Sequence, residues 1–321
     1  MNPPDFRLHS ASRLPCAGRR TGFTLTEVLV AIGLVTVLLA ILIPAVQQAR
    51  EASRMTQCRN NLKNIGVACH DMQANTRYFP AIGKLIDGGE FGFSSLVQLL
   101  PYAEQTALYQ SFDFKTYPAA KQNRAVIDQT PVTLWKCPGA PFTYPQLTSY
   151  LGNSGTGFLD TLEPRDDGFL GDGNGVGPGD FTDGLSNTVA FTECRANSGI
   201  PPLVNAIINV EPRATTGDEF EQFQQRCQAL TSSHIVGREG DSRSFGEVWT
   251  QPTMGASRYN HLLPPGSNSC DSGGAANLSI ITPSSHHSNV LNTLLADGSV
   301  RSTSLSIDIA SWRNMGSRGS D

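Results

Sequence analysis

The chain has 321 residues, of which 39% are hydrophobic and 16% charged, and it contains 31 glycines and 20 prolines. This hydrophobic content excludes a disordered chain, and the many turn-forming residues favour short strands over a helical bundle. Arg7, Arg13, Arg19 and Arg20 lie in the first 22 residues against Asp5 alone, which leaves 20 basic and 27 acidic side chains in the remainder. That acidic remainder argues against nucleic acid as a partner.

The first predicted element is an apolar helix near the N-terminus. Residues 28–46 are interrupted only by Gly33, Thr36 and Pro44, and at about 1.5 Å per residue this run crosses roughly the hydrocarbon core of a bilayer. An ordinary secretory signal is cut after its apolar stretch, whereas here Gly22 and the basic residues 19–20 precede it. We therefore expect a leader at residues 1–22 and a retained transmembrane helix at residues 23–46.

The segment Gly22-Phe23-Thr24-Leu25-Thr26-Glu27 resembles the prepilin cleavage and methylation signal of type IV pilins and type II secretion pseudopilins. The resemblance implies that prepilin peptidase cuts between Gly22 and Phe23 and methylates the new amine of Phe23. Glu27 matches the glutamate of mature pilins, and Pro44 falls where many pilins have a proline. A carboxylate in an apolar helix needs a partner, which the resemblance implies is the terminal amine of a neighbouring pilin-like subunit.

The same resemblance sets the direction of insertion. It places the N-terminus in the cytoplasm before processing and the head outside the cytoplasmic membrane, in the periplasm or another extracytoplasmic space. The basic pair Arg19-Arg20 favours the same direction, although Arg50, Arg54 and Arg59 follow the run. The simpler alternative is an ordinary signal anchor with Glu27 at the level of the lipid headgroups.

An amphipathic continuation of the helix is predicted over residues 47–75, ending near Asn75. Its apolar residues recur at steps of three and four, at Met55, Cys58, Leu62, Ile65, Cys69 and Met72, which is the pattern of a helix face that packs on a domain. Residues 76–321 then form an α+β head, rich in antiparallel strands, with helices at residues 94–109 and 218–230. The fold class is α+β, with one long N-terminal helix packed on a pilin-like head.

Cysteine usage indicates an oxidising compartment. Removal of the leader takes Cys16 with it and leaves six cysteines, an even number suited to disulfides. Cys58 and Cys69 lie on the apolar face of the predicted helix, about 16 Å apart along its axis, and cannot bond to each other. Each is expected to bond to a cysteine of the head, and the candidates are Cys137 and Cys194. Cys227 and Cys270 then pair by elimination.

Five segments occur in one order along the chain: Cys58-Arg59-Asn60-Asn61-Leu62-Lys63, Leu100-Pro101-Tyr102 with Glu104-Gln105, Cys137-Pro138, Thr182-Asp183-Gly184-Leu185-Ser186-Asn187-Thr188, and His287 followed by Asp297-Gly298. This order resembles the bacterial family called domain of unknown function 1559 (DUF1559), whose members join a prepilin-type start to a C-terminal His-x9-Asp-Gly segment. The resemblance covers nearly the whole chain and implies its fold and export, but no biochemical activity. Cys69 and Cys194 depart from the pattern and suggest an additional bridge.

His287 and Asp297 invite a catalytic or metal-binding interpretation, because both residue types serve such sites. Their spacing favours a structural one. If residues 290–295 form a strand that turns at Asp297 and Gly298, the two side chains lie near opposite ends of extended chain. A two-residue hairpin turn then places His287 opposite Asp308, and we expect a structural cross-strand pair.

Two features of the head suggest ligands. Oxygen-bearing side chains alternate at Asp172, Asn174, Asp180 and Asp183, as in a calcium loop, although the match is incomplete and a plain glycine-rich turn is the simpler interpretation. Trp249 is expected to be a packing residue, and only an exposed Trp249 would mark a sugar- or peptide-binding surface. No other cofactor is expected.

The predicted function is that of a pilin- or pseudopilin-type structural or assembly subunit, linked to type II secretion. No nucleophile and base can be paired, so we expect no enzymatic activity. The expected partners are prepilin peptidase, other pilin-like subunits and the membrane. The alternative is a membrane-tethered extracytoplasmic module that binds carbohydrate, peptide or calcium and uses the prepilin pathway for delivery.

Overall fold

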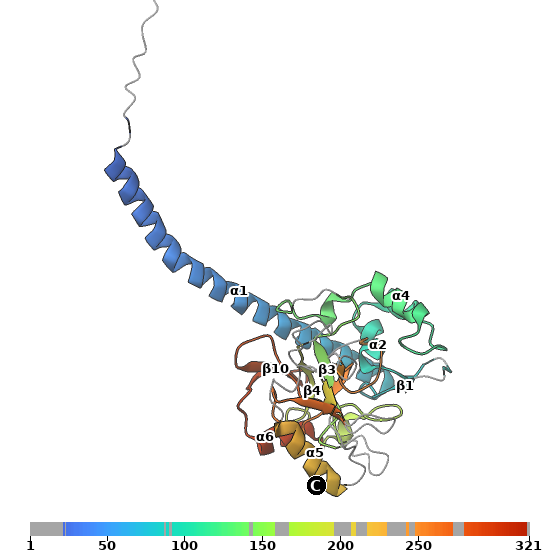
Figure 1. Ribbon diagram of the computed structural model, residues 1–321. Coiled ribbons are helices and arrows are strands. Elements are labelled where there is room, and N and C mark those ends of the chain that lie inside the picture. The colour runs from blue at the N-terminus through green and yellow to red at the C-terminus, as the bar shows by residue number, and fades with distance from the viewer. Residues whose placement is uncertain are drawn as a thin grey trace, which may run out of the picture. The chain divides into compact units, whose positions relative to one another are not determined.

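The computed structural model (Figure 1) describes residues 22, 24–86, 88–89, 92–140, 144–157, 167–195, 207–209, 217–229, 242–243, 248–271 and 279–319. The chain forms two compact units, Met1–Arg50 and Glu51–Asp321. In the first unit, the described residues from position 25 onward are helical and belong to α1 (Leu25–Thr76), which also supplies the first element of the second unit. The second unit is called the head below.

Helix α1 is continuous through Pro44 and ends at Thr76, close to the predicted end near Asn75. Arg77, the next residue, has a φ of 72°, a left-handed conformation that cannot continue a right-handed helix. Its N–H donates to the carbonyl of Gln73 at 2.8 Å, which caps the last turn. The predicted apolar face is buried from Cys58 to Met72, while Met55 is only half-buried.

The centre of the head is a five-stranded sheet in the order β11-β10-β4-β3-β7. Its strands are β3 (Tyr150–Asn153), β4 (Val189–Glu193), β7 (Arg258–Tyr259), β10 (Val290–Leu295) and β11 (Val300–Ser304). All neighbours pair antiparallel except β3 and β7. The head is therefore α+β with a mainly antiparallel sheet, as predicted.

The other strands of the described residues form two smaller sheets. Strands β1 (Lys84–Leu85) and β2 (Gly92–Phe93) form a two-stranded sheet, and a four-stranded sheet has the order β6-β5-β8-β9. The latter contains β5 (Ile207–Asn209), β6 (Ser242–Arg243), β8 (Ser269–Asp271) and β9 (Ser279–Ile280). The remaining helices are α2 (Ser95–Leu99), α3 (Thr106–Gln110), α4 (Lys121–Gln129), α5 (Gly217–Ala229) and α6 (Ile309–Gly316), with 3-10 turns η1 (Leu100–Tyr102), η2 (Thr133–Trp135) and η3 (Pro178–Asp180).

The head half of α1 packs closely against the β10–β11 hairpin. A Cβ on Gly66 would lie 2.8 Å from Leu294 Cδ1 and 3.3 Å from the Gly298 Cα, so a larger residue would displace the Leu294 side chain and crowd the turn. Lys63 Nζ donates to the Gly298 carbonyl at 2.7 Å, and Tyr150 Oη on β3 donates to the Cys58 carbonyl at 3.3 Å. These contacts place α1 against the central sheet of the head.

One predicted helix differs from the structure. The single helix expected at residues 94–109 is divided into α2, η1 and α3, because Pro101 cannot continue an α-helix and Glu104 has a φ of 57°. Trp249 is only 1% exposed, so it is a packing residue as expected, and the alternative of an exposed tryptophan surface is wrong. The helix predicted at residues 218–230 is confirmed as α5.

Candidate functional site

The start of α1 contains the predicted processing point and assembly charge. Phe23 lies outside the described residues, and Gly22 has open space around its Cα. Glu27 Oε2 accepts hydrogen bonds from the N–H and the hydroxyl of Thr24, each at 2.8 Å, while Thr24 Oγ1 accepts from the Glu27 N–H at 3.3 Å. This reciprocal arrangement is a capping box at the helix N-terminus, a role for Glu27 that the sequence analysis missed.

Within the described part of the chain, α1 is the one helix long and apolar enough to cross a membrane. Its first half exposes large apolar side chains, including Leu25, Leu29 and Ile41, all more than 60% exposed. No acidic or basic residue occurs between Glu27 and Arg50. Such a surface is costly in water and suits lipid.

The head contains a buried cluster of polar side chains beside a disulfide. Cys58 of α1 bonds to Cys137, and suitable donor atoms of Cys58, Cys137, Glu193 and His287 all lie within 4.8 Å of one another. His287 Nε2 lies 3.7 Å from Cys137 Sγ and 3.8 Å from Glu193 Oε1. Both side chains are almost fully buried, with 0% of the His287 side chain and 1% of the Glu193 side chain exposed.

A second carboxylate fixes the orientation of the imidazole. His287 Nδ1 donates to Glu51 Oε1 at 2.7 Å, because a carboxylate can only accept, and this directs Nε2 towards the disulfide and Glu193. The hydrogen bond from His287 is the main cause that lowers the pKa of Glu51, and its pairing with Arg54 adds to the effect. Glu51 is the first residue of the head, so this contact ties the head half of α1 to the loop before β10.

Glu193 is held by neutral donors. Its Oε2 accepts from Ser285 Oγ at 2.8 Å and from the Asn292 N–H at 3.2 Å, and its Oε1 accepts from Asn292 Nδ2 at 2.8 Å. A buried carboxylate is costly unless its oxygens are satisfied. These three contacts compensate part of that cost and keep Oε1 beside the imidazole.

The predicted pair of His287 and Asp308 is wrong. Strand β10 pairs with β11 in the register Val290↔Ser304 to Leu294↔Val300, and three residues, not two, form the turn, with Gly298 at a φ of 80°. The expected register therefore differs by one residue, which moves every side chain to the other face. Asp308 accepts from the Ser311 N–H at 3.0 Å as the N-cap of α6. The position of Asp297 and Gly298 in the hairpin turn agrees with the prediction.

The six cysteines that the structure describes form two bridges. Besides Cys58–Cys137, the structure joins Cys227 to Cys270, the pair that elimination predicted. Cys69 and Cys194 are free and buried, so the additional bridge expected for them is wrong. They occupy separate hydrophobic clusters, and burial raises the pKa of both thiols, which keeps them protonated.

The proposed calcium ligands Asp172, Asn174, Asp180 and Asp183 lie in and around η3. Asp180 Oδ2 accepts from the Gly177 N–H at 2.7 Å and thereby caps this turn. Calcium binding by these residues stays a prediction. Among the described residues, the group of histidine, cysteine and acidic side chains that is spaced for a metal ion is the Cys58 cluster.

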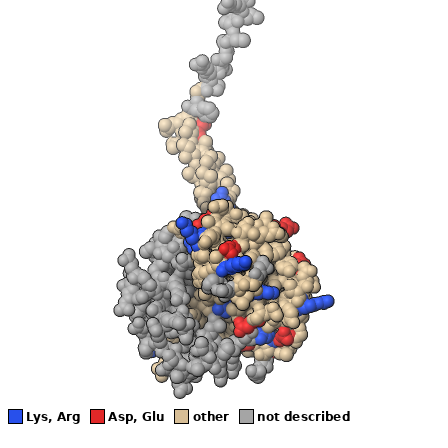
Figure 2. All heavy atoms as spheres, turned by 90° about the vertical axis from the view of Figure 1, so that its right-hand side faces the viewer, with Lys and Arg blue, Asp and Glu red and all other residues tan. Residues whose placement is uncertain are grey.

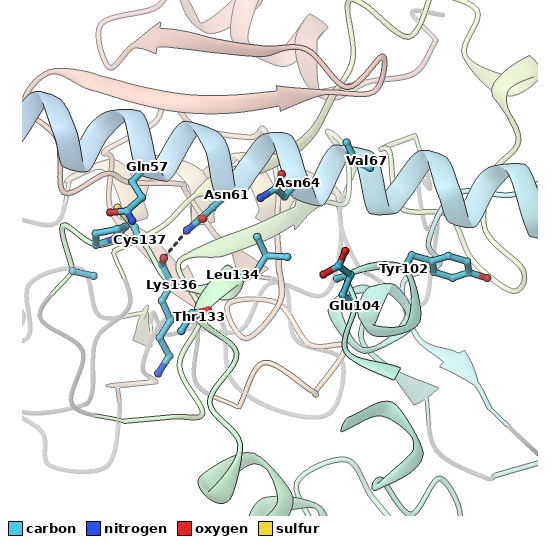
Figure 3. Close-up of a pocket in the computed structure, with 13 residues that line it drawn as sticks. Gln57, Asn61, Asn64, Val67, Tyr102, Glu104, Thr133, Leu134, Lys136 and Cys137 are labelled. Atoms are coloured by element: carbon cyan, nitrogen blue, oxygen red, sulfur yellow. Dashed lines mark hydrogen bonds between the residues drawn. The ribbon is translucent and has the colours of Figure 1, made fainter. Parts of the chain in front are cut away.

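A groove of about 650 Å³ runs beside α1 and reaches Cys137. Figure 3 shows the side chains of Gln57, Asn61 and Asn64 along α1 on one side and Lys136 and Cys137 on the other. Asn61 Nδ2 donates to the Lys136 carbonyl at 2.8 Å across it. The lining contains the amides of Gln57, Asn61 and Asn64 and includes Cys137, one half of the disulfide.

Comparison with known families assigns most of the chain. A family model described as "Protein of unknown function (DUF1559)" matches residues 47–310. The chain belongs to this family. A second model, the prokaryotic N-terminal methylation motif, matches residues 18–43. No curated protein and no solved structure matches the chain.

The methylation motif lies wholly within the first structural unit, and the DUF1559 match begins four residues before the second unit and covers that unit as far as residue 310. The motif together with the apolar helix fits a membrane-anchored, single-pass, pilin-like protein that is a substrate of prepilin peptidase. Figure 2 shows basic and acidic side chains interspersed on the described part of one face of the head.

Sequence reasoning missed Glu51 and Glu193 of this DUF1559 chain. Glu51 is 236 residues from His287, and no local pattern connects them. For Glu193 a weak signal existed, since it is an acidic residue at the end of an apolar strand, and a buried acid indicates a nearby partner.

Proposed function

We propose that this DUF1559 protein is a pilin- or pseudopilin-type subunit whose role is assembly and not catalysis, linked to type II secretion. The observation that carries the proposal is a methylation motif that leads into a helix of 52 residues. The second half of that helix has a face that is buried in the head. In such a subunit, the first half of α1 holds the protein in the membrane and the second half is part of the head.

The proposal requires processing between Gly22 and Phe23. Mass spectrometry of the chain purified from its membrane is expected to give a mature N-terminus at Phe23 that carries a methyl group. Replacing Gly22 by Val is expected to leave the precursor intact, and open space around Gly22 means that the change disturbs recognition and not packing. A mature chain that starts anywhere else contradicts the leader assignment.

The second requirement is a charge at Glu27 that pairs with the amine of a neighbouring subunit. Because Glu27 also forms the capping box, the variants must separate the two roles. Glu27→Gln keeps the hydrogen bonds of a capping box and removes the charge, whereas Glu27→Ala removes both. Cross-linking in membranes would report co-assembly with other pilin-like subunits.

We expect both Glu27 variants to lose co-assembly and both to be processed normally. If the Gln variant assembles like the parent chain and the Ala variant does not, helix capping and not the charge is responsible. If both assemble normally, the subunit proposal is wrong. Prepilin peptidase and pilin-like subunits are the proposed partners, with the head outside the cytoplasmic membrane.

The groove favours a second candidate function, a membrane-tethered binding module. Its amide-bearing residues Gln57, Asn61 and Asn64 are suited to hydrogen bonds with a sugar or a peptide backbone. Glycan and peptide arrays probed with the full chain in detergent would test this candidate. Binding that is lost in Asn64→Leu and retained in Glu27→Gln would favour the binding module.

A further inference from the structure

Two ionisable side chains lie beside the buried Cys58–Cys137 disulfide, although a disulfide needs no such neighbours. The Cys58–Cys137 bond is complete without a neighbour, yet His287 and Glu193 lie against it, both removed from solvent. Burying a carboxylate and an imidazole next to two sulfurs is costly. Thiolate, imidazole and carboxylate are together the ligand types that proteins use for Zn²⁺.

Two distances within the cluster are close to those of a tetrahedral zinc site. Zinc bonds of about 2.0–2.3 Å to nitrogen, oxygen and sulfur place neighbouring ligand atoms about 3.3–3.8 Å apart. His287 Nε2 already lies 3.7 Å from Cys137 Sγ and 3.8 Å from Glu193 Oε1. The two sulfurs, which are bonded to each other in the structure, would have to move apart to this spacing once reduced.

The surrounding hydrogen bonds are those expected around metal ligands. A metal-bound histidine usually donates its other N–H to a carboxylate, which fixes the ring and its tautomer. Glu51 accepts from His287 Nδ1 at 2.7 Å in this arrangement. Glu193 is likewise oriented by Ser285 and Asn292. Cys137 also lines the groove beside α1.

We propose that, in the dithiol form of the chain, Cys58, Cys137, Glu193 and His287 form a zinc site. The newly synthesised chain carries both cysteines as thiols, so no electron transfer is needed for binding. Zn²⁺ forms bonds to both sulfurs, to Glu193 Oε1 and to His287 Nε2, and the two thiol protons leave to solvent. The disulfide and the metal use the same sulfurs and exclude each other.

The test uses the full-length chain in detergent, reduced with a phosphine without oxygen and then desalted. Incubation with zinc chloride alone, followed by a second desalting step, is expected to leave one zinc per chain by elemental analysis. Cobalt chloride is expected to give the visible bands of tetrahedral cobalt and a thiolate charge-transfer band. The unreduced chain is expected to bind neither metal in this way.

Two cysteine variants identify the sulfurs. Loss of zinc in Cys58→Ser/Cys137→Ser, with retention in Cys227→Ser/Cys270→Ser, assigns the ligands to this cluster. The proposal is wrong if the reduced parent chain retains no zinc, or if its cobalt spectrum lacks the thiolate band. It is also wrong if zinc is retained when Cys58 and Cys137 are replaced. The cobalt spectrum is measured on the parent chain, so it tests the proposed zinc site even if a cysteine variant fails to fold.

A milder pair of variants tests the surrounding shell. Glu51 is 38% exposed, so Glu51→Gln is expected to fold and to weaken zinc affinity about 10–100-fold. The matched control is Asp128→Asn on α4, which neutralises a carboxylate of the head outside the cluster. Equal zinc affinity in these two variants would contradict the role of Glu51, whereas a loss confined to Glu51→Gln supports the site.

Discussion

His261 provides a quantitative prediction for the pH dependence of head stability. The imidazole is fully buried, stacks on Trp312 with ring centroids 3.9 Å apart, and lies against Gly316. Its Nδ1 donates to the Trp312 carbonyl at 2.8 Å, so Nε2 is left to accept from the Tyr259 hydroxyl, also at 2.8 Å. Burial lowers the pKa of His261 to about 3.

The sign follows from linkage. The unfolded chain binds a proton at His261 below about pH 6.5, while the folded head does not until about pH 3, so stability falls as the pH falls between these values. Each pKa unit corresponds to about 1.4 kcal/mol. From about pH 8 to about pH 5 this residue therefore removes about 2 kcal/mol from the free energy of unfolding.

The assay is urea unfolding of the full chain in detergent, followed by tryptophan fluorescence, since Trp135, Trp249 and Trp312 are all buried. His261→Asn keeps a donor for the Trp312 carbonyl and cannot be protonated. Its loss of stability between the two pH values should be about 2 kcal/mol smaller than that of the parent chain. His286, whose pKa burial lowers to about 4, contributes equally to both chains. Identical losses in the two chains would refute the reasoning.

Three further predictions concern packing and cross-links in the head. Gly66→Ala gains about 1 kcal/mol in helix propensity but meets Leu294 and the β10–β11 turn. We expect a net loss of about 1–2 kcal/mol in urea unfolding, and adding Leu294→Val should recover part of it; additive effects would contradict the contact. Replacing Cys227 and Cys270 together by Ala opens a cross-link across 43 residues and should cost about 2–4 kcal/mol; an unchanged urea midpoint would show that the bridge contributes nothing. Asp308→Ala should lower the urea midpoint because α6 loses its N-cap, while Asp308→Asn should lower it less; equal losses in both would exclude capping as the cause.

The elements that could be predicted are those fixed by local patterns. The apolar run and the steps of three and four specified α1 to within a residue or two of its end, since a helix face repeats every 3.6 residues. The turn at Asp297 and Gly298 was visible because glycine is favoured at a positive φ. The break at Pro101 was also visible in the sequence, and the helix prediction at residues 94–109 overlooked it.

The elements that could not be predicted depend on a long-range register. His287 lies before Val290, the first paired residue of β10, and its imidazole contacts Glu51, which is 236 residues away in the sequence; no local pattern encodes that contact. Cys58 and Cys137 are 79 residues apart, and with six cysteines the correct partner depends on the fold. The buried site at His287 is therefore a product of tertiary structure.

The buried cluster also bears on how α1 is held in the head. Its members come from α1 (Glu51 and Cys58), from Cys137 after η2, from the end of β4 and from the loop before β10. If α1 were held in the head by noncovalent contacts alone, a force applied to the anchor during assembly would pull it out, because the contacts along the helix would break one after another. A bond at Cys58, whether to Cys137 or through a metal, instead fixes α1 to the head within two turns of its first head residue. Under the proposed subunit function, removing this link should weaken the retention of the head under load far more than its equilibrium stability, since the force acts on that one connection.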